Sequence, residues 1–199
     1  MTKERVQDKR ERILSAALKV FADRGFYNAK VSEVAREAGV ADGTIYLYFR
    51  NKDDLLISLF EDRMEYLITR LVEELERVGG SAVDRIRRMV FMHLSIAHES
   101  PDLAEFITVE LRQSGKFIKD YENPKFLSYL KVLRDLVEEG QAEGTLLPNI
   151  DARATVRAVF GALDEVLLTL TLASRHRSVD IEIAAEQLSN LFLHGMKAQ

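Results

Sequence analysis

Apolar residues along the chain recur at spacings of three and four residues, and no stretch shows the sustained apolar–polar alternation of a β-strand. This spacing matches the 3.6 residues of an α-helical turn, so the pattern predicts an all-α protein. Glycines, prolines and polar capping residues divide the pattern into about nine helices. We expect them near residues 6–24, 31–38, 42–48, 51–79, 81–98, 100–114, 123–144, 151–174 and from 178 or 180 to 196.

Composition indicates a soluble globular chain. It has 199 residues, of which 47% are hydrophobic and 30% charged, which is enough for one or two domains with a buried core. The absence of cysteine excludes disulfides and thiolate metal sites. No apolar run approaches the roughly 20 residues of a membrane span, and the charged N-terminus has no apolar signal core. We therefore expect a cytoplasmic protein with no membrane partner.

Charge is distributed unevenly along the chain. The net charge of −4 argues at first against a nucleic-acid partner. Residues 1–52, however, hold eleven Lys and Arg against seven Asp and Glu, whereas residues 53–199 hold seventeen against twenty-five. This asymmetry favours a small basic domain over residues 1–52 and an acidic one over residues 53–199.

Two short predicted helices, 31–38 and 42–48, have the layout of a helix-turn-helix. Gly39 can adopt the left-handed conformation that the turn between them requires. In this motif the second helix enters the major groove of DNA. Its hydroxyl groups, on Thr44, Tyr46 and Tyr48, can bond phosphates or bases, and Lys52 adds a cation at the next helix start. The alternative is a helical hairpin whose tyrosines only pack.

The residues around this motif are similar to the signature of the TetR family of repressors. The similarity lies in VSEVAREAGV (31–40) and GTIYLYFRNK (43–52), preceded by ILSAA (13–17) and FADRGF (21–26) and followed by Leu55-Leu56. The resemblance implies three N-terminal DNA-binding helices and about six more that bind a ligand and dimerise. It also implies that a dimer binds a palindromic double-stranded operator and is released from it by a small-molecule effector.

The resemblance also assigns DNA contacts to residues of this chain. Base-edge contacts fall on Asp42, Gly43 and Tyr46. Phosphate contacts fall on Thr44, Tyr48 and Lys52, with Ser32 as an additional contact. The chain departs from the family at Ala41, where a Ser or Thr commonly caps the second helix. If Asp42 caps this helix instead, its carboxylate is withdrawn from the groove.

The last two predicted helices are candidates for a homodimer interface. The helix from residue 151 has an apolar sector wider than burial on one side needs, and the final helix has a clean apolar face. Two copies of each helix would form a four-helix interface, as the resemblance also implies. The alternative is that these faces only complete the core of the monomer.

A narrower likeness concerns the effector. Residues 40–49, 56–60, 110–114 and 161–165 are similar to the bacterial fatty-acid-degradation regulators of this family, which respond to long-chain acyl-CoA. An acyl chain needs an apolar tunnel, for which the candidates are Phe91, Leu94, Phe106, Val109, Leu133, Leu136, Phe160 and Leu167. The CoA phosphates need cations, for which the candidates are Arg112, Lys116 and Lys119, with Lys125, Lys131 and Arg134 nearby in sequence. The alternatives are an ordinary core and an aromatic or multidrug effector.

Nothing in the sequence favours an enzyme or a bound cofactor. Asp164 and Glu165 are adjacent on a predicted helix and therefore point about 100° apart, which is unsuited to a catalytic dyad. His93 lies on an apolar face and is expected to be a hydrogen-bonded core residue, and His98 is turned away from that face. We expect a regulator; a small-molecule hydrolase is the alternative from another class.

Overall fold

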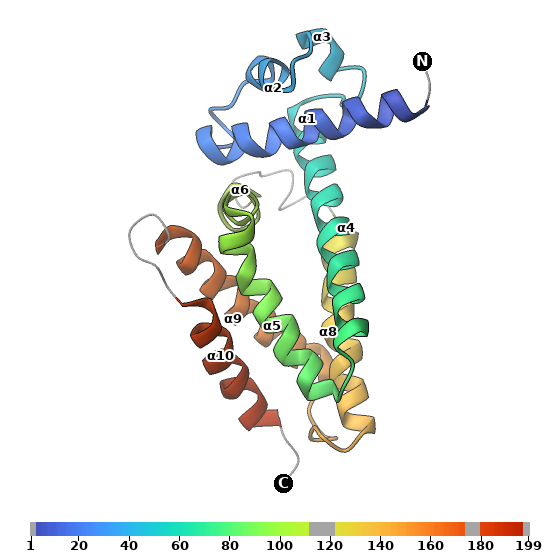
Figure 1. The fold of residues 1–199 in the computed structure, drawn as a ribbon, viewed down its shortest axis with the longest axis vertical. Helices are drawn as coiled ribbons and strands as arrows, with labels where there is room; N and C mark the ends of the chain where they lie inside the picture. Colours follow the sequence, from blue (N-terminus) through green and yellow to red (C-terminus); the bar gives the residue numbers. More distant parts are fainter. Residues whose placement is uncertain (1–2, 112–121, 174–179, 197–199) are drawn as a thin grey trace. The chain divides into compact units, whose positions relative to one another are not determined.

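The structure is a computed structural model that describes residues 3–111, 122–173 and 180–196 (Figure 1). These residues form nine α-helices and one π-helix, with no strand among them, which confirms the predicted all-α fold. They divide into two compact units. The first comprises residues 1–63 and 102–122, and the second comprises residues 64–101 and 123–199. The boundary expected from charge, between residues 52 and 53, stays a prediction.

The first unit contains the helix-turn-helix. Its helices are α1 (Lys3–Arg24), α2 (Val31–Ala38), α3 (Asp42–Ile45), the start of α4 (Lys52–Val78), most of α6 (Pro101–Glu105) and the π-helix η1 (Phe106–Glu110). Helix α1 packs against α2 and η1, and α2 packs against α3. The core between them is apolar and includes Ile13, Leu14, Phe21, Val34, Ile45, Phe49, Leu55 and Leu59.

The second unit is built around α5 (Ala82–Glu99), which packs against α8 (Pro124–Ala142), α9 (Ala152–Ala173) and α10 (Ile181–Met196). Figure 1 shows α5 running beside α9 and α10. The buried side chains between these helices include Ile86, Met89, Leu94, Leu133, Val137, Leu163, Leu167 and Leu193. No helix in the described ranges is both long and apolar enough to cross a membrane.

Capping residues set several helix starts as predicted. The Ser81 hydroxyl accepts a bond from the Asp84 N–H at 3.3 Å, and Asp84 accepts one from the Ser81 N–H at 3.1 Å. Asn51 accepts from the Asp54 N–H at 2.9 Å at the start of α4. These bonds satisfy N–H groups that have no partner within the helix.

Two segments differ from the predicted helices. The α-helix α3 ends at Ile45, and residues 46–48 continue as a turn. Its backbone hydrogen bonds span three residues instead of four: Leu47 N donates to Thr44 O at 3.2 Å and Tyr48 N to Ile45 O at 3.0 Å. The helix expected over residues 100–114 changes to a π-helix at Phe106. Within it, the Thr108 hydroxyl donates to the Ala104 carbonyl at 2.7 Å, the acceptor that an α-helical N–H would use. Residues 112–114 lie outside the described ranges.

Candidate DNA-binding surface and effector core

The turn between α2 and α3 is held by backbone bonds and by α1. Gly39 has φ 64°, and the N–H of Val40 donates to the Ala35 carbonyl at 3.0 Å, which closes the end of α2. The Arg12 guanidinium donates to the Ala38 carbonyl at 2.6 Å. This contact joins α1 to the turn and fixes the direction in which α3 leaves it.

Residues 42–48 form the surface that we call the reading surface. Ile45 is buried and anchors it, whereas the Tyr46 and Leu47 residues are 56% and 82% exposed. Asp42 and Gly43 are exposed, and Thr44 and Tyr48 are half-buried. Ser32 is exposed in the first turn of α2. The predicted DNA contacts at these positions therefore have access to a partner, with Thr44 and Tyr48 more restricted than the others.

Asp42 does not cap α3, so this alternative from the sequence is wrong. Ala41 occupies the cap position, with no side-chain hydrogen bond, and its carbonyl accepts from the Thr44 N–H at 2.8 Å. Asp42 is the first helical residue. Because the backbone is already helical at residue 42, its carboxylate is not drawn into the cap and stays on the reading surface.

Gly43 occupies open space. A Cβ placed on it meets no atom of the chain within 4 Å. Packing within the protein therefore does not require glycine here, although glycine in a helix is less stable than alanine by about 1 kcal/mol. A close approach from outside the chain is a physical reason for its presence.

Lys52 is already engaged by the protein. Its ammonium donates to the carbonyls of Tyr27 at 3.1 Å and Ala29 at 2.8 Å, and lies 4.6 Å from the centre of the Phe26 ring. Partial burial lowers the pKa of this ammonium, while Asp53 opposes the shift. Two of its three N–H donors are thus used to hold the segment after α1, which leaves one for the predicted phosphate contact.

Two cations near the reading surface were missed from the sequence. Arg36 on α2 and Arg50 after α3 are exposed, and within the described ranges no ion pair is found for either. They were not selected from the sequence as DNA contacts because neither lies on the second helix of the motif. Both belong to the basic first unit and are candidates for phosphate contacts.

A buried carboxylate ties η1 to the end of α1. Glu110 is 4% exposed and accepts a hydrogen bond from the Phe26 N–H at 2.5 Å. Its two oxygens also lie 3.5 and 3.8 Å from the position of a Cβ on Gly25, whose φ is 77°. Nothing in the sequence marked Glu110 for this role, because its partner lies far away along the chain.

The second unit holds an aromatic cluster that we call the effector core: His93, Phe126, Tyr129 and Phe160. The Phe126 and Phe160 rings meet edge to face at 4.7 Å, and the His93 and Tyr129 rings lie 6.0 and 6.1 Å from Phe160. His93 Nδ1 and the Tyr129 hydroxyl are 2.7 Å apart. The prediction that His93 is a hydrogen-bonded core residue is confirmed.

Burial determines the protonation of this pair. It lowers the pKa of His93 to about 4 and raises that of Tyr129, so both groups are neutral at pH 7. The tautomer that leaves fewest groups unpaired has the Tyr129 hydroxyl donating to Nδ1 and a proton on Nε2. Among the described residues no partner is found for Nε2, which lies near a small cavity of about 30 Å³ beside Arg70 and Glu99.

The predicted effector contacts are only partly brought together. Leu94, Leu133, Leu136 and Leu167 are buried in the second unit, where Phe91 and Phe160 are half-buried. Phe106 is buried and Val109 half-buried in the first unit. The predicted cations Arg112, Lys116 and Lys119 lie outside the described ranges. Lys125 pairs with Glu65 across α8 and α4.

The structure places an exposed helix-turn-helix surface in one unit and an apolar and aromatic core in a second, helical unit. This arrangement is typical of a DNA-binding transcriptional regulator. Two family profiles match the chain along almost its whole length. Residues 13–59 match "Bacterial regulatory proteins, tetR family", and residues 60–195 match "YsiA-like protein, C-terminal region". The chain belongs to the TetR family of transcriptional regulators.

Three of the similar proteins within the family are named as regulators of fatty-acid metabolism or degradation. The chain is 33% identical to the fatty acid metabolism regulator protein of Bacillus subtilis over 92% of its length and 93% of the relative. It is similar to the fatty acid degradation regulator FadR of Bacillus halodurans, with a TM-score of 0.86, 32% identity and coverage of 96% and 97%. FadR of Bacillus subtilis in complex with stearoyl-CoA gives a TM-score of 0.86 and 32% identity over 93% and 98% of the two chains. The family match and these relatives assign the chain to the transcriptional regulators and not to the hydrolase alternative.

Proposed function

We propose that this chain is a homodimeric repressor that binds a palindromic operator and leaves it on binding a long-chain acyl-CoA. The observation that carries the proposal is the similarity, along almost the full chain, to a regulator whose structure holds stearoyl-CoA. An acyl-CoA would act by favouring a dimer geometry that no longer fits the operator. No separate cofactor takes part.

The reading surface supplies the DNA contacts of the proposal. Asp42, Gly43 and Tyr46 would face base edges in the major groove, and Tyr46 combines an exposed ring with a hydroxyl. Phosphate contacts would come from Ser32, Thr44, Tyr48 and the remaining donor of Lys52. In a dimer the two α3 helices would reach successive major grooves, about 34–36 Å apart.

Exposed apolar groups on the last two helices support a homodimer through them. Leu172 on α9 and Ile183 and Leu191 on α10 are 50%, 53% and 70% exposed. Helix α9 also has exposed small residues at Ala158 and Gly161, and a Cβ on Gly161 meets nothing within 4 Å. Small residues let two helix backbones approach closely, and burying the exposed leucines and isoleucine would stabilise the dimer.

The apolar residues of the second unit favour an acyl chain over a polar effector. The predicted tunnel residues there are aliphatic or aromatic, and the effector core contains one polar pair, His93 and Tyr129, that is neutral at pH 7. An aromatic or multidrug ligand is the second candidate, because the cluster around Phe160 would also stack against a ring.

Operator binding and release test the proposal together. Operators selected from random DNA would be labelled and titrated by fluorescence anisotropy with the wild type, with Tyr46→Ala and with Tyr66→Ala. Tyr66 is a matched control because it is 52% exposed but lies on α4 in the second unit. We expect Tyr46→Ala alone to weaken binding, and lauroyl- to stearoyl-CoA to release the wild type at micromolar concentration.

Each half of the proposal can fail separately. Undiminished operator affinity in Tyr46→Ala contradicts the reading surface. Retention of the operator at saturating acyl-CoA contradicts the effector, and mass spectrometry of the ligand that co-purifies with the protein would then identify an aromatic alternative.

A further inference from the structure

Leu47 is the most exposed apolar residue of the reading surface. It is 82% exposed, and no large apolar residue in the described ranges is more exposed. The neighbouring Tyr46 has a hydroxyl that water can bond, whereas the leucine side chain is entirely hydrocarbon. Single exposed leucines are common on protein surfaces, so the position of Leu47 decides whether it has a partner.

The backbone places Leu47 among the predicted DNA contacts. Its N–H donates to the Thr44 carbonyl at 3.2 Å. In a turn with bonds of this span, side chains three residues apart lie on the same side. Leu47 therefore lies on the side of Thr44 and, in sequence, between Tyr46 and Tyr48. A Cβ on Gly43 meets no atom within 4 Å, so the leucine does not fold back onto the first turn of α3.

The reading surface lacks the side chains that most often identify guanine and adenine. Arginine and lysine pair with guanine, and asparagine and glutamine pair with adenine, but residues 42–48 contain none of these four. They contain an acid, a glycine, three hydroxyl residues and two aliphatic residues, of which Ile45 is buried. Base recognition by this segment therefore depends on few hydrogen bonds, and Leu47 is its one exposed aliphatic group.

The base edges in the major groove of DNA offer a matching group. Thymine carries a 5-methyl group there, and apolar side chains recognise thymine by contact with it. The contact removes hydrocarbon of both partners from water, which is favourable. A contact with phosphate oxygens would not do this. The chemistry of an exposed leucine between predicted base and phosphate contacts thus favours thymine over the other bases.

We propose that Leu47 recognises thymine, by packing against the 5-methyl group of one thymine in each half of the operator. The inference rests on the proposed function, because it requires the reading surface to enter the major groove. It adds a specificity-determining residue and the base that this residue selects. The sequence indicated the hydroxyl groups on either side of Leu47, whereas the exposure of the leucine is visible only in the structure.

The test changes single methyl groups in the DNA and the side chain in the protein. In an operator selected from random DNA, each thymine is replaced in turn by deoxyuridine at the symmetric positions of both half-sites. Deoxyuridine pairs with adenine as thymine does and lacks only the 5-methyl group. Each operator is titrated by fluorescence anisotropy, without acyl-CoA, with the wild type, Leu47→Ala and Leu47→Met.

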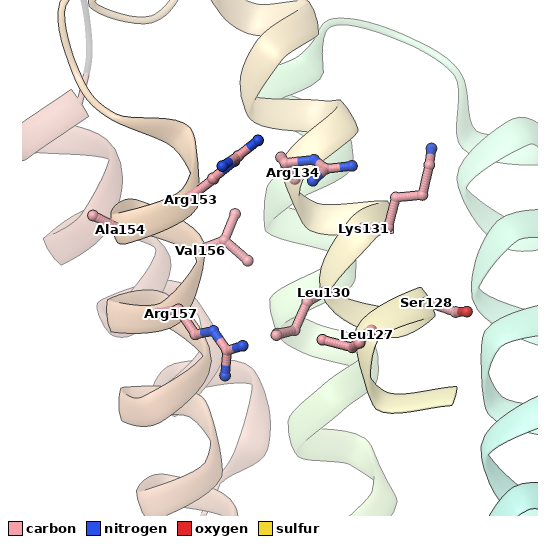
Figure 2. A pocket seen from close by; sticks show the side chains of 9 residues that line it. All are labelled: Leu127, Ser128, Leu130, Lys131, Arg134, Arg153, Ala154, Val156 and Arg157. Carbon is pink, nitrogen blue, oxygen red and sulfur yellow. The ribbon is translucent and has the colours of Figure 1, made fainter. Parts of the chain in front are cut away.

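The matched control is Leu127→Ala, which makes the same change at a leucine of the second unit. Leu127 is 51% exposed and lies on α8, where it lines a groove that α9 completes (Figure 2). It is not part of the reading surface, so its operator affinities should equal those of the wild type. Both leucines are exposed, so both alanine variants should keep the circular dichroism spectrum of the wild type.

We expect deoxyuridine at one symmetric pair of positions to weaken wild-type binding by about fifteenfold, since each lost methyl contact weakens it by about fourfold. Leu47→Ala should bind the unmodified operator at least as weakly and should not distinguish thymine from deoxyuridine at that pair. Leu47→Met keeps an apolar side chain and should retain most of the discrimination. At every other thymine the wild type and Leu47→Ala should respond equally.

Several results overturn the inference. Unchanged affinity of Leu47→Ala for the unmodified operator shows that the leucine does not contact DNA. Equal responses of the wild type and Leu47→Ala to deoxyuridine at every position show that another group recognises the methyl groups, or that none does. A lower molecular mass of Leu47→Ala in light scattering, with unchanged DNA affinity, assigns the leucine to a contact between copies of the chain.

These outcomes are separable from those of the proposed function. If stearoyl-CoA does not release the operator while the effect of one methyl pair disappears in Leu47→Ala, the proposed release fails and the contact of Leu47 stands. If Tyr46→Ala weakens binding and stearoyl-CoA releases the operator, but Leu47→Ala responds to every deoxyuridine as the wild type does, the proposed function stands and the contact of Leu47 fails.

Discussion

The two units present their functional groups in opposite ways. In the first unit they lie on a short exposed segment, where Tyr46 and Leu47 follow directly after α3 and its buried residue Ile45. In the second unit the polar pair His93 and Tyr129 is buried inside an aromatic cluster contributed by three helices. A surface that meets DNA can be specified by neighbouring residues, whereas a pocket for a small molecule exists only after distant segments pack.

The two candidate sites also differ in the contacts that hold them in place. The reading surface depends on a few polar bonds to backbone groups, from Arg12, Lys52 and Glu110. The effector core depends on apolar and ring contacts, together with one hydrogen bond. Substitutions that remove single bonds should therefore act on DNA binding, and substitutions that alter apolar surfaces should act on assembly and ligand binding.

The largest expected effect comes from charging the apolar face of α10. Ile183→Glu with Leu191→Glu should prevent dimerisation, because each exposed apolar group proposed to be buried in the interface becomes a charge without a partner. A monomer contacts one half of a palindrome, so operator affinity should fall by roughly a hundredfold or more. Light scattering after size-exclusion chromatography measures the mass, and anisotropy measures the affinity.

A matched control for this variant is Glu182→Ala with Glu186→Ala, two exposed positions of the same helix. It should remain dimeric. A doubly charged α10 that still runs as a dimer would show that the second unit assembles through another surface.

The next largest effect is expected at Glu110 in the first unit. Glu110→Ala leaves the buried Phe26 N–H without its acceptor, so the free energy of unfolding should fall by about 2 kcal/mol. Glu110→Gln keeps an acceptor oxygen and should lose less. Urea denaturation followed by circular dichroism measures both, with the exposed Glu122→Ala in the same unit as control. Equal stability of Glu110→Ala and the control would mean that the bond to Phe26 does not support the first unit.

The fold was predictable from the sequence because its signals are local. Helix starts at Ser81, Asn51 and Asn123 depend on bonds within three residues, and all three are formed. The π-helix at Phe106 was not predictable, since the sequence pattern there does not distinguish it from an α-helix and does not show that Thr108 and Glu110 are buried within it. Local patterns indicate that a helix is present; tertiary contacts determine whether its turns stay regular.

The site was predictable to a different extent in each unit. The reading surface could be located because the residues that would contact DNA lie within one motif. The role of Lys52 in binding the carbonyls of Tyr27 and Ala29 was not visible, because the contact crosses more than twenty residues. In the second unit the sequence indicated His93 as a core residue but not its bond to Tyr129.

The buried histidine makes the second unit sensitive to acid. The unfolded chain takes up a proton on this residue near pH 6.5, whereas burial lowers the pKa of folded His93 to about 4. The unfolded state therefore binds more protons between these values, and stability is lost as the pH falls from 6.5 to 4. At pH 5 the loss from this group should be about 2 kcal/mol, and above pH 6.5 its contribution no longer changes.

The measurement compares unfolding free energies at pH 7 and pH 5. His93→Leu with Tyr129→Phe removes both partners of the bond and leaves apolar groups in their place. Arg70 and Glu99, the charged groups beside the cavity, are present in both proteins. The exposed His98→Asn serves as control and should keep the wild-type pH dependence. If the double variant loses as much stability as the wild type on acidification, His93 is not the acid-sensitive group.

The smallest expected change in stability comes from two glycines four residues apart, Gly43 and Gly39. Replacing each by alanine should change stability in opposite directions, which separates the role of the reading surface from that of the fold. Gly43→Ala meets no atom of the chain and gains helix propensity, so the protein should be more stable by up to about 1 kcal/mol. Its operator affinity should nevertheless fall, by about tenfold, because the added methyl group lies where α3 is proposed to approach DNA. Gly39→Ala has φ 64° and brings a Cβ within 3.3 Å of the Arg12 guanidinium, so it should destabilise the fold by about 1 kcal/mol. The folded fraction of that variant should lose less operator affinity than Gly43→Ala does, since Gly39 lies in the turn and not on the reading surface. If Gly43→Ala binds DNA as well as the wild type, the open space at residue 43 is not filled by DNA, and the exposed segment of the first unit is not the surface that reads the operator.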